Sequence, residues 1–215
     1  MPSSRFLIDR LLRPIDFNSA TSIVELGVGT GCITRTLLER MSPDCSLTCV
    51  EVDEEFVQAC ASIGDDRLSV HQACATDLKS VLSAGGVGAV DYIVSSVPLS
   101  ILDDDLADDI LEVAQSCLRP GGKFLQYQYS LTYLSRLTAR YGDVRLGFTL
   151  RNFPPAFVYE CVQRGLVLGR VRRVPRALTS SGEPQFVAQS QCLSWFTERP
   201  AGAGQIRWFG PARKP

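Results

Sequence analysis

Short apolar runs alternate with amphipathic stretches over the first 165 residues of the chain. Apolar runs bounded by turn residues predict strands, and apolar positions at helical spacing predict helices. The predicted strands are 22–26, 46–51, 68–71, 89–95, 123–129, 144–151 and 157–162. The predicted helices, which lie between the first five strands, are 32–41, 54–63, 77–82 and 104–118. This alternation predicts an α/β fold, with a mostly parallel seven-stranded sheet and helices on both of its faces.

Local signals mark several boundaries of these elements. Asp53 and Asp103 stand where a side chain can cap the start of a helix, and the Pro-Gly-Gly at 120–122 predicts a turn after the longest helix. Only residues 152–156 separate the last two strands, which is too short for a crossover connection. We therefore expect these two strands to form an antiparallel pair at the edge of the sheet.

The character of the chain changes after Gly165. Residues 166–215 contain five Pro, five Gly, eight Lys and Arg, and both tryptophans of the chain. Strands are expected near 167–174 and 186–195, followed by a loose end from Pro200 onward. We interpret the chain as one domain over residues 1–165 with a basic, partly loose C-terminal extension over residues 166–215.

The overall composition is that of a soluble globular protein, with 45% apolar and 21% charged residues. No run approaches the roughly 20 apolar residues that a membrane-spanning helix needs. Charged residues interrupt the first 16 positions, so a secretory leader is not expected. These features predict a cytoplasmic protein that does not span a membrane.

The eight cysteines are irregularly spaced in a chain too long for a small disulfide-stapled fold, so reduced thiols are expected. No CxxC occurs and His71 is the only histidine, which leaves a zinc cluster without ligands at the usual spacing. No metal site is therefore predicted.

Charge is unevenly distributed, although the net charge is only −1. Residues 1–160 contain 13 Lys and Arg against 21 Asp and Glu, whereas residues 161–215 contain 9 against 2. The two parts are therefore expected to face different partners, and the basic part suits an anionic surface.

The most informative segment is a glycine-rich turn between a buried strand and a helix. Its glycines, Gly27, Gly29 and Gly31, follow the spacing GxGxG instead of the GxGxxG of dinucleotide-binding folds. Glycine at such a turn lets the backbone approach a ligand closely. Glu25 precedes the turn and would repel a pyrophosphate, but not an aminoacyl ammonium group or a sugar hydroxyl.

A second carboxylate, Glu51, ends the next strand about 20 residues further on, where it can accept both hydroxyls of a ribose. Together these features fit S-adenosylmethionine, and the stretch resembles motif I and the acidic loop of the Rossmann-like class I methyltransferases. A tight turn with an unrelated surface carboxylate is the alternative. The resemblance implies these cofactor-binding residues: Glu25, Gly27, Gly29, Thr30, Gly31, Glu51, Val52, Cys74, Ala75 and Ser95.

The segment 72–77 departs from that pattern. Families of this type often have an Asp after the third strand that bonds the adenine amino group, and here Cys74 occupies the position. Either a backbone carbonyl or Asp77 replaces it, or the adenine is held mainly by packing.

Longer motifs make the resemblance more specific. VELGVGTG at 24–31, SSVPL at 95–99, PGGKFLQYQY at 120–129 and RNFPPAFVY at 151–159 together resemble the bacterial phospholipid N-methyltransferases, which are relatives of the ribosomal RNA adenine dimethylases. The resemblance covers residues 2–164. It implies an enzyme that methylates the amine of phosphatidylethanolamine or a related amino-lipid, once or repeatedly, toward phosphatidylcholine.

Three other functions stay open from the sequence. A soluble small-molecule amine or hydroxyl is an alternative acceptor, and a partner-binding scaffold with a methyltransferase fold is a non-enzymatic one. Adenine N6 methylation of nucleic acid uses the motif [ND]-x-P-[YF], to hydrogen-bond and stack on the flipped base. Here Ser96 and Leu99 occupy the polar and aromatic positions, so nucleic acid is not the expected substrate.

Methyl transfer from a sulfonium requires alignment of a neutral amine, so a group that accepts the amine's proton is useful. Tyr129, Tyr127 and the backbone carbonyls around Ser95 and Ser96 are the candidates, with Tyr129 first because it occupies the family's tyrosine position. Arg151 can pair with a lipid phosphate. Strand packing for the tyrosines and an ion pair at the sheet edge for Arg151 are the alternatives.

Residues 5–16 form an amphipathic helical pattern. Phe6 projects between Arg10 and Arg13, away from an apolar face that is expected to cover the cofactor site. An outward aromatic flanked by arginines is typical of a membrane-interface anchor, which predicts peripheral contact with an anionic membrane surface. The apolar face consists of Leu7, Ile8, Leu11, Leu12 and Ile15; the tail residues that can extend the contact are Arg170, Arg172, Arg173, Arg176, Trp195 and Trp208.

Overall fold

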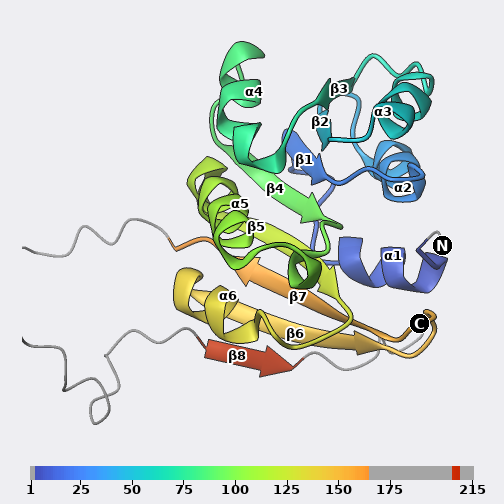
Figure 1. Ribbon diagram of the computed structural model, residues 1–215. Helices are drawn as coiled ribbons and strands as arrows, with labels where there is room; N and C mark the ends of the chain where they lie inside the picture. The colour runs from blue at the N-terminus through green and yellow to red at the C-terminus, as the bar shows by residue number, and fades with distance from the viewer. Residues whose placement is uncertain (1–2, 165–204, 209–215) are drawn as a thin grey trace, which may run out of the picture.

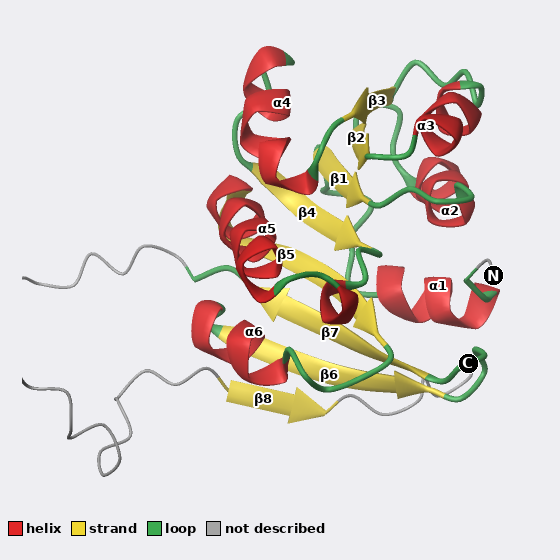
Figure 2. Cartoon of the chain, in the orientation of Figure 1, coloured by secondary structure: helices red, strands yellow, loops and turns green. Residues whose placement is uncertain are grey.

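A computed structural model describes residues 3–164 and 205–208 and shows one twisted sheet with helices on both sides (Figures 1 and 2). The strands are β1 (Ser22–Leu26), β2 (Ser46–Glu51), β3 (Leu68–Gln72), β4 (Val90–Ser95), β5 (Leu118–Gln128), β6 (Asp143–Thr149), β7 (Ala156–Val162) and β8 (Gln205–Trp208). The helices are α1 (Arg5–Leu12), α2 (Cys32–Arg40), α3 (Glu54–Ala61), α4 (Leu78–Ala84), α5 (Asp104–Cys117) and α6 (Leu134–Arg140), with 3₁₀ turns at Ala75–Asp77 and Leu99–Ile101.

The strand order is β3-β2-β1-β4-β5-β7-β6-β8. Strands β1 to β5 pair in parallel, whereas β7 is antiparallel to both β5 and β6. The expected α/β class is therefore confirmed, with its seven strands and its antiparallel pair. An eighth strand, β8, pairs in parallel with β6 beyond these seven.

Continuous apolar runs gave β1 and β2 with the predicted bounds, but other boundaries differ. The segment at 120–122 does not end an element, because it lies inside β5, where Gly121 has φ 81° and donates to the carbonyl of Gln163. Asp53 caps α3 through the amides of Glu55 and Phe56, whereas Asp103 precedes α5 without a side-chain cap. The short helix α6 was not predicted.

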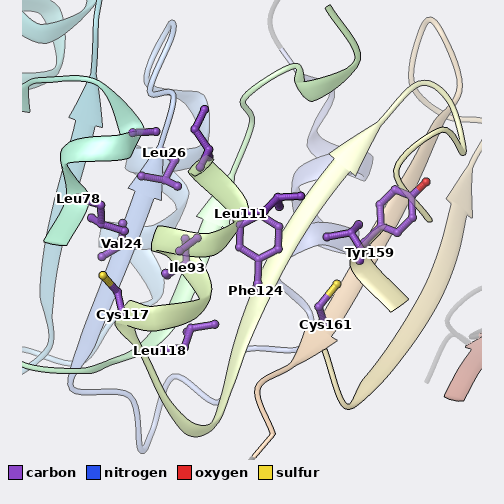
Figure 3. Close-up of a cluster of buried hydrophobic side chains, with 14 of the residues drawn as sticks. Val24, Leu26, Leu78, Ile93, Leu111, Cys117, Leu118, Phe124, Tyr159 and Cys161 are labelled. Carbon is purple, nitrogen blue, oxygen red and sulfur yellow. The ribbon is translucent and has the colours of Figure 1, made fainter. Parts of the chain in front are cut away.

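Two buried clusters cover the two faces of the sheet. On one face, α4, α5 and α6 pack over strand residues such as Ile93 and Phe124, and Figure 3 shows Leu78 and Leu111 of the helices facing them. On the other face, α1 and α2 pack over β1, β4 and β5. The apolar side of α1 is buried here as expected, with Leu7, Ile8, Leu11, Leu12 and Ile15 all in the core.

Backbone hydrogen bonds continue past the carboxyl ends of the central strands and tie the following loops together. The amide of Gly27 donates to the carbonyl of Val50 at 2.9 Å, and the amide of Ser96 donates to the carbonyl of Leu26 at 2.9 Å. These bonds bring the glycine turn, the end of β2 and the loop after β4 to one edge, where open α/β sheets bind ligands.

The C-terminal extension is mostly outside the described residues. This includes the strands expected near 167–174 and 186–195. The prediction of a loose end from Pro200 onward is wrong for residues 205–208, because these residues form β8. In the part of the chain that is described, no helix is both long and apolar enough to cross a membrane.

Candidate functional site

The glycine turn has the backbone conformation that its sequence predicts. Gly27, Gly29 and Gly31 have φ values of 77°, 50° and 74°, which residues with a Cβ rarely adopt. A Cβ on Gly27 would lie 3.0 Å from the Oγ of Ser96, so the loop after β4 crowds that position. A Cβ on Gly29 or Gly31 would meet no atom of the described residues within 4 Å. Gly27 is therefore required by the protein's own packing, and the other two border open space.

Glu51 joins the glycine turn to the end of β2. Its Oε2 accepts from the amide of Gly29 at 3.1 Å, and its Oε1 accepts from the amides of Val52 at 2.8 Å and Asp53 at 3.1 Å. The side chain is buried, and three backbone donors hold its carboxylate in one orientation. Because Oε2 accepts a single bond, it keeps acceptor capacity for the hydroxyl of a ligand.

A cavity of about 400 Å³ lies at this edge of the sheet beside Glu51. Its walls come from the ends of β1, β2, β3 and β4 and from α5, and most of them are apolar. The lining includes five of the predicted cofactor-binding residues, Gly27, Glu51, Val52, Cys74 and Ala75, and the catalytic candidate Ser96. It also includes residues that were not among the predicted site residues, such as Val50, Ala73, Val97, Leu102, Leu106 and Ile110. Asp77 is not among them.

A second cavity, of about 200 Å³, lies beside Gly29 and Thr30 on the α1 side of the glycine turn. Ser96 lines both cavities and so stands between them. The second cavity is more polar, and its lining comprises Ser3, Val28, Gly29, Thr30, Cys32, Ile33, Phe56, Ser96 and Tyr127. The arrangement offers an apolar space and a polar space that meet at a single residue.

The two candidate tyrosines of β5 have different positions. Tyr127 lines the second cavity, where its phenol oxygen accepts from the Oγ of Ser3 at 3.3 Å, and burial raises the pKa of Tyr127 above its usual value. Tyr129 is half exposed and lies edge-on to Tyr127, with 5.9 Å between ring centroids. Tyr127 thus borders a cavity, whereas Tyr129 lies at the surface.

Two amide side chains of β5, which were not predicted to have a role, hold the loop after β4. Gln126 and Gln128 each donate from Nε2 to the carbonyl of Val97, at 2.9 and 3.0 Å. Ser95, also buried, accepts from the amide of Val97, and the hydroxyl of Ser96 bonds to the carbonyl of Gly27. The sequence does contain a signal for this role: Gln126 and Gln128 are polar residues at alternating positions of an otherwise apolar predicted strand.

Glu25 lies beneath the site and lines neither cavity. It is fully buried on β1, where its Oε2 accepts from the Sγ of Cys49 at 3.6 Å. Burial raises the pKa of Glu25 to about 8, so its neutral form predominates at pH 7. The structure thus places this carboxyl group behind the glycine turn.

Arg151 lies in the β6–β7 loop and is exposed. Its guanidinium stands 4.9 Å from the ring centroid of Phe6, and that of Arg5 stands 5.1 Å from the same ring. Arg5 and Arg151 therefore flank Phe6, and the expected flanking by Arg10 and Arg13 is wrong. Arg151 reaches the ring because the β6–β7 loop folds back onto the start of α1. Within residues 3–164, Arg151 forms no salt bridge, so the expected ion-pair alternative does not describe it.

Comparison with known families identifies a domain and a relative. Residues 24–124 match the family model described as a methyltransferase domain. The ornithine lipid N-methyltransferase of Singulisphaera acidiphila is 32% identical over 163 residues, which cover 74% of this chain and 85% of the relative.

Solved structures share the fold at low sequence identity. The N-methyltransferase NodS from Bradyrhizobium japonicum WM9, in complex with S-adenosyl-L-homocysteine, superposes with a TM-score of 0.62 at 16% identity, over 75% of this chain and 87% of NodS. TrmN from Thermus thermophilus gives a TM-score of 0.57 at 18% identity, over 74% of this chain and 48% of TrmN. Magnesium protoporphyrin IX methyltransferase from Synechocystis PCC 6803, with bound S-adenosylmethionine, gives 0.57 at 12% identity, over 74% of this chain and 77% of that enzyme.

Proposed function

The protein belongs to the class I methyltransferases that use S-adenosylmethionine, and we propose that it transfers the methyl group to the amine of an amino-lipid. The observation that carries the proposal is the polar cavity at Tyr127 and Ser96, which adjoins the apolar cavity beside Glu51. The relative named for ornithine lipid N-methylation matches 74% of this chain and supports the same class of acceptor.

The residues at the sheet edge fit S-adenosylmethionine. The open space at Gly29 and Gly31 admits a ligand against the backbone, and the free acceptor capacity of Glu51 suits a ribose hydroxyl. The apolar cavity suits the adenine, packed beside Val52 and Cys74 without an Asp partner. When bound, the cofactor supplies an electrophilic methyl group on a sulfonium. We assign the remaining predicted contacts to three groups: Gly27, Thr30 and Ala75 at the cavity walls, Ser95 supporting the loop, and Glu25 acting from behind the turn.

The acceptor amine has to be neutral and aligned. An alkyl amine with a pKa of about 10 is only ~0.1% neutral at pH 7, so the site has to favour loss of a proton. The phenol of Tyr127 is protonated at that pH, and burial raises its pKa further. Its oxygen therefore orients the nitrogen by accepting an N–H hydrogen bond, while the proton of the ammonium group passes to water. Ser96, which borders both cavities, stands where the amine and the methyl group meet. Tyr129 and Arg151 lie further out, and Arg151 suits the acidic part of a headgroup.

Phosphatidylethanolamine and ornithine lipid are the acceptors to distinguish. We further propose that the enzyme reaches them as a peripheral protein on an anionic membrane surface, at the inner face of the cell membrane. Exposed Phe6 beside two arginines supports this placement. Methylation of nucleic acid finds no support, because Leu99 is buried and leaves no aromatic side chain to stack on a base at the motif position.

The test is transfer of labelled methyl groups from S-adenosylmethionine to a total lipid extract, followed by identification of the labelled species. Purified phosphatidylethanolamine, ornithine lipid, a soluble primary amine and RNA are compared in parallel. Tyr127→Phe is expected to lower kcat about tenfold without changing cofactor affinity, whereas Tyr129→Phe has a smaller effect. Label that appears only in the soluble amine or in RNA refutes the lipid acceptor.

A further inference from the structure

The β6–β7 loop, residues 150–155, presents apolar side chains from a well-anchored backbone. Asn152 is buried; its Oδ1 accepts from the amide of Ser4 at 3.0 Å, and its Nδ2 donates to the carbonyl of Pro154 at 2.8 Å. On either side of it, Leu150 is 74% exposed and Phe153 is 81% exposed. The loop thus turns its polar residue inward and two large apolar residues outward, which is the reverse of an ordinary surface turn.

The start of α1 extends this surface. Ser4 is bound to the loop through both its amide and its hydroxyl, so Phe6 and Arg5 lie beside Arg151. Figure 1 shows the beginning of α1 and the β6–β7 loop together at one end of the molecule. We call this surface the docking tip; it consists of Arg5, Phe6, Leu150, Arg151 and Phe153.

The two cations of the docking tip are not neutralised within the described part of the chain. Arg5 and Arg151 make no salt bridge there, whereas Arg136 and Arg140 of α6 pair with Asp104 and Asp108. A surface of apolar side chains with free guanidinium groups suits a bilayer that carries anionic headgroups. It does not suit a second copy of itself, since a symmetric contact would bring like charges together.

The docking tip is connected to the cavity assigned to the acceptor through residues 3 and 4. Ser3 lines that cavity, and the next residue, Ser4, is hydrogen-bonded to Arg151 and Asn152. A lipid whose acyl chains stay in the bilayer therefore has its headgroup close to the cavity when the tip rests on the surface.

We propose that the docking tip inserts into the interface of an anionic bilayer, with Phe6, Leu150 and Phe153 at the acyl boundary and Arg5 and Arg151 at the headgroups. This rests on the proposed function, in which the acceptor is a membrane lipid. The insertion orients the enzyme so that the second cavity opens toward its substrate.

Another exposed apolar residue provides a matched control. Ile101 is 78% exposed, as much as the residues of the tip, but it precedes three consecutive aspartates at 103–105. An anionic bilayer repels that region, so Ile101 is expected to stay in water.

The first experiment is co-sedimentation of the full chain with phosphatidylglycerol vesicles. Leu150→Ser combined with Phe153→Ser is expected to weaken binding more than tenfold, and Ile101→Ser to leave it unchanged. Both changes affect exposed side chains, and thermal unfolding checks that each variant is folded. Equal vesicle binding by the parent and the double variant overturns the proposal that the docking tip inserts. That outcome includes the case in which the basic extension alone binds the vesicles. A parent dimer that the double variant dissociates in sedimentation velocity also overturns it, in favour of a second copy.

A second experiment measures insertion directly. In a background with Trp195→Phe and Trp208→Phe, Phe153→Trp is expected to shift to shorter emission wavelength on vesicles and to be quenched by brominated acyl chains, whereas Ile101→Trp is not. An unquenched Trp at position 153 contradicts insertion. Methyl transfer to detergent-dispersed lipid distinguishes the lipid-acceptor hypothesis from the docking hypothesis. The double variant should retain this activity. If the parent lacks the activity but still binds vesicles, the lipid acceptor is refuted and the docking is not.

Discussion

Two regions of the molecule differ in how they are built: the sheet edge, which fits the cofactor, and the docking tip. The sheet edge is shaped mainly by backbone atoms: glycines with positive φ form the turn, and three amides hold Glu51. At the tip, exposed side chains on an anchored loop make the surface. A backbone-built site tolerates few substitutions, because the main chain itself has to move. A surface made of side chains can change its partner through single substitutions that leave the fold intact.

The largest expected effect lies at the backbone-built edge. Gly29→Val should lower S-adenosylmethionine affinity by at least 100-fold, on the order of 3 kcal/mol, because its side chain fills the open space beside the turn. Gly86→Val is the matched control, since Gly86 also has a positive φ and an open Cβ position but lies outside the site. Calorimetry should show lost binding only in the first variant. Near-normal affinity of Gly29→Val would remove the cofactor assignment.

The next effect concerns the buried carboxyl group behind the turn. The pKa of Glu25 is about 8 in the folded protein and 4.5 in its usual state, so folding favours the protonated form. Its stabilising contribution is complete below pH 4.5 and is lost as the pH rises toward 8; between pH 5 and 8 the loss is on the order of 3 kcal/mol. Urea unfolding at several pH values should show this decline, and Glu25→Gln should flatten it. Glu39→Gln, an exposed change on α2, should not, and a parent whose stability is constant over this range contradicts the assignment.

A smaller effect is expected where a single side chain serves the ligand. Glu51→Gln replaces an acceptor with an amide that cannot accept all the backbone bonds and also bind a ribose, so cofactor affinity should fall by about 1 to 3 kcal/mol. Glu55→Gln in the first turn of α3 is the control. An unchanged dissociation constant for Glu51→Gln, with unchanged thermal stability, would mean that another residue holds the ribose.

The smallest effect is expected at the anchor of the tip. Asn152→Ala removes the acceptor for the Ser4 amide and the donor to Pro154, which should cost about 1 to 2 kcal/mol of folding stability. Cofactor affinity should remain as in the parent, because Asn152 lies outside both cavities. Calorimetric cofactor binding and thermal unfolding check the two statements, and a large loss of affinity would show that the tip and the edge are not independent.

The sequence predicted the edge better than the tip because the edge is local. Gly27, Gly29 and Gly31 are close in the chain, and Glu51 comes at the end of the next strand, so spacing alone brings them together. The burial of Glu25 was not foreseen, since a carboxylate beside a glycine turn looks the same in sequence whether it faces the ligand or the core.

The tip depends on contacts between distant segments. Phe6 was expected between Arg10 and Arg13 because helical projection considers only neighbours along the helix, and Arg151 comes from the far end of the domain. The support of Val97 by Gln126 and Gln128 was missed for the same reason. The choice between Tyr127 and Tyr129 required knowledge of where the N-terminal residues lie.

The two hydrogen bonds of Ser4 join residues that are 147 and 148 positions apart in the chain. Closing so long a loop is entropically costly, and the bonds cannot form until the ribosome has released the β6–β7 loop. Strands β1 to β4, with the glycine turn and Glu51, precede that loop in synthesis. The cofactor pocket can therefore assemble while the chain is still emerging, and the acceptor pocket is completed only when the last part of the domain folds back onto the first.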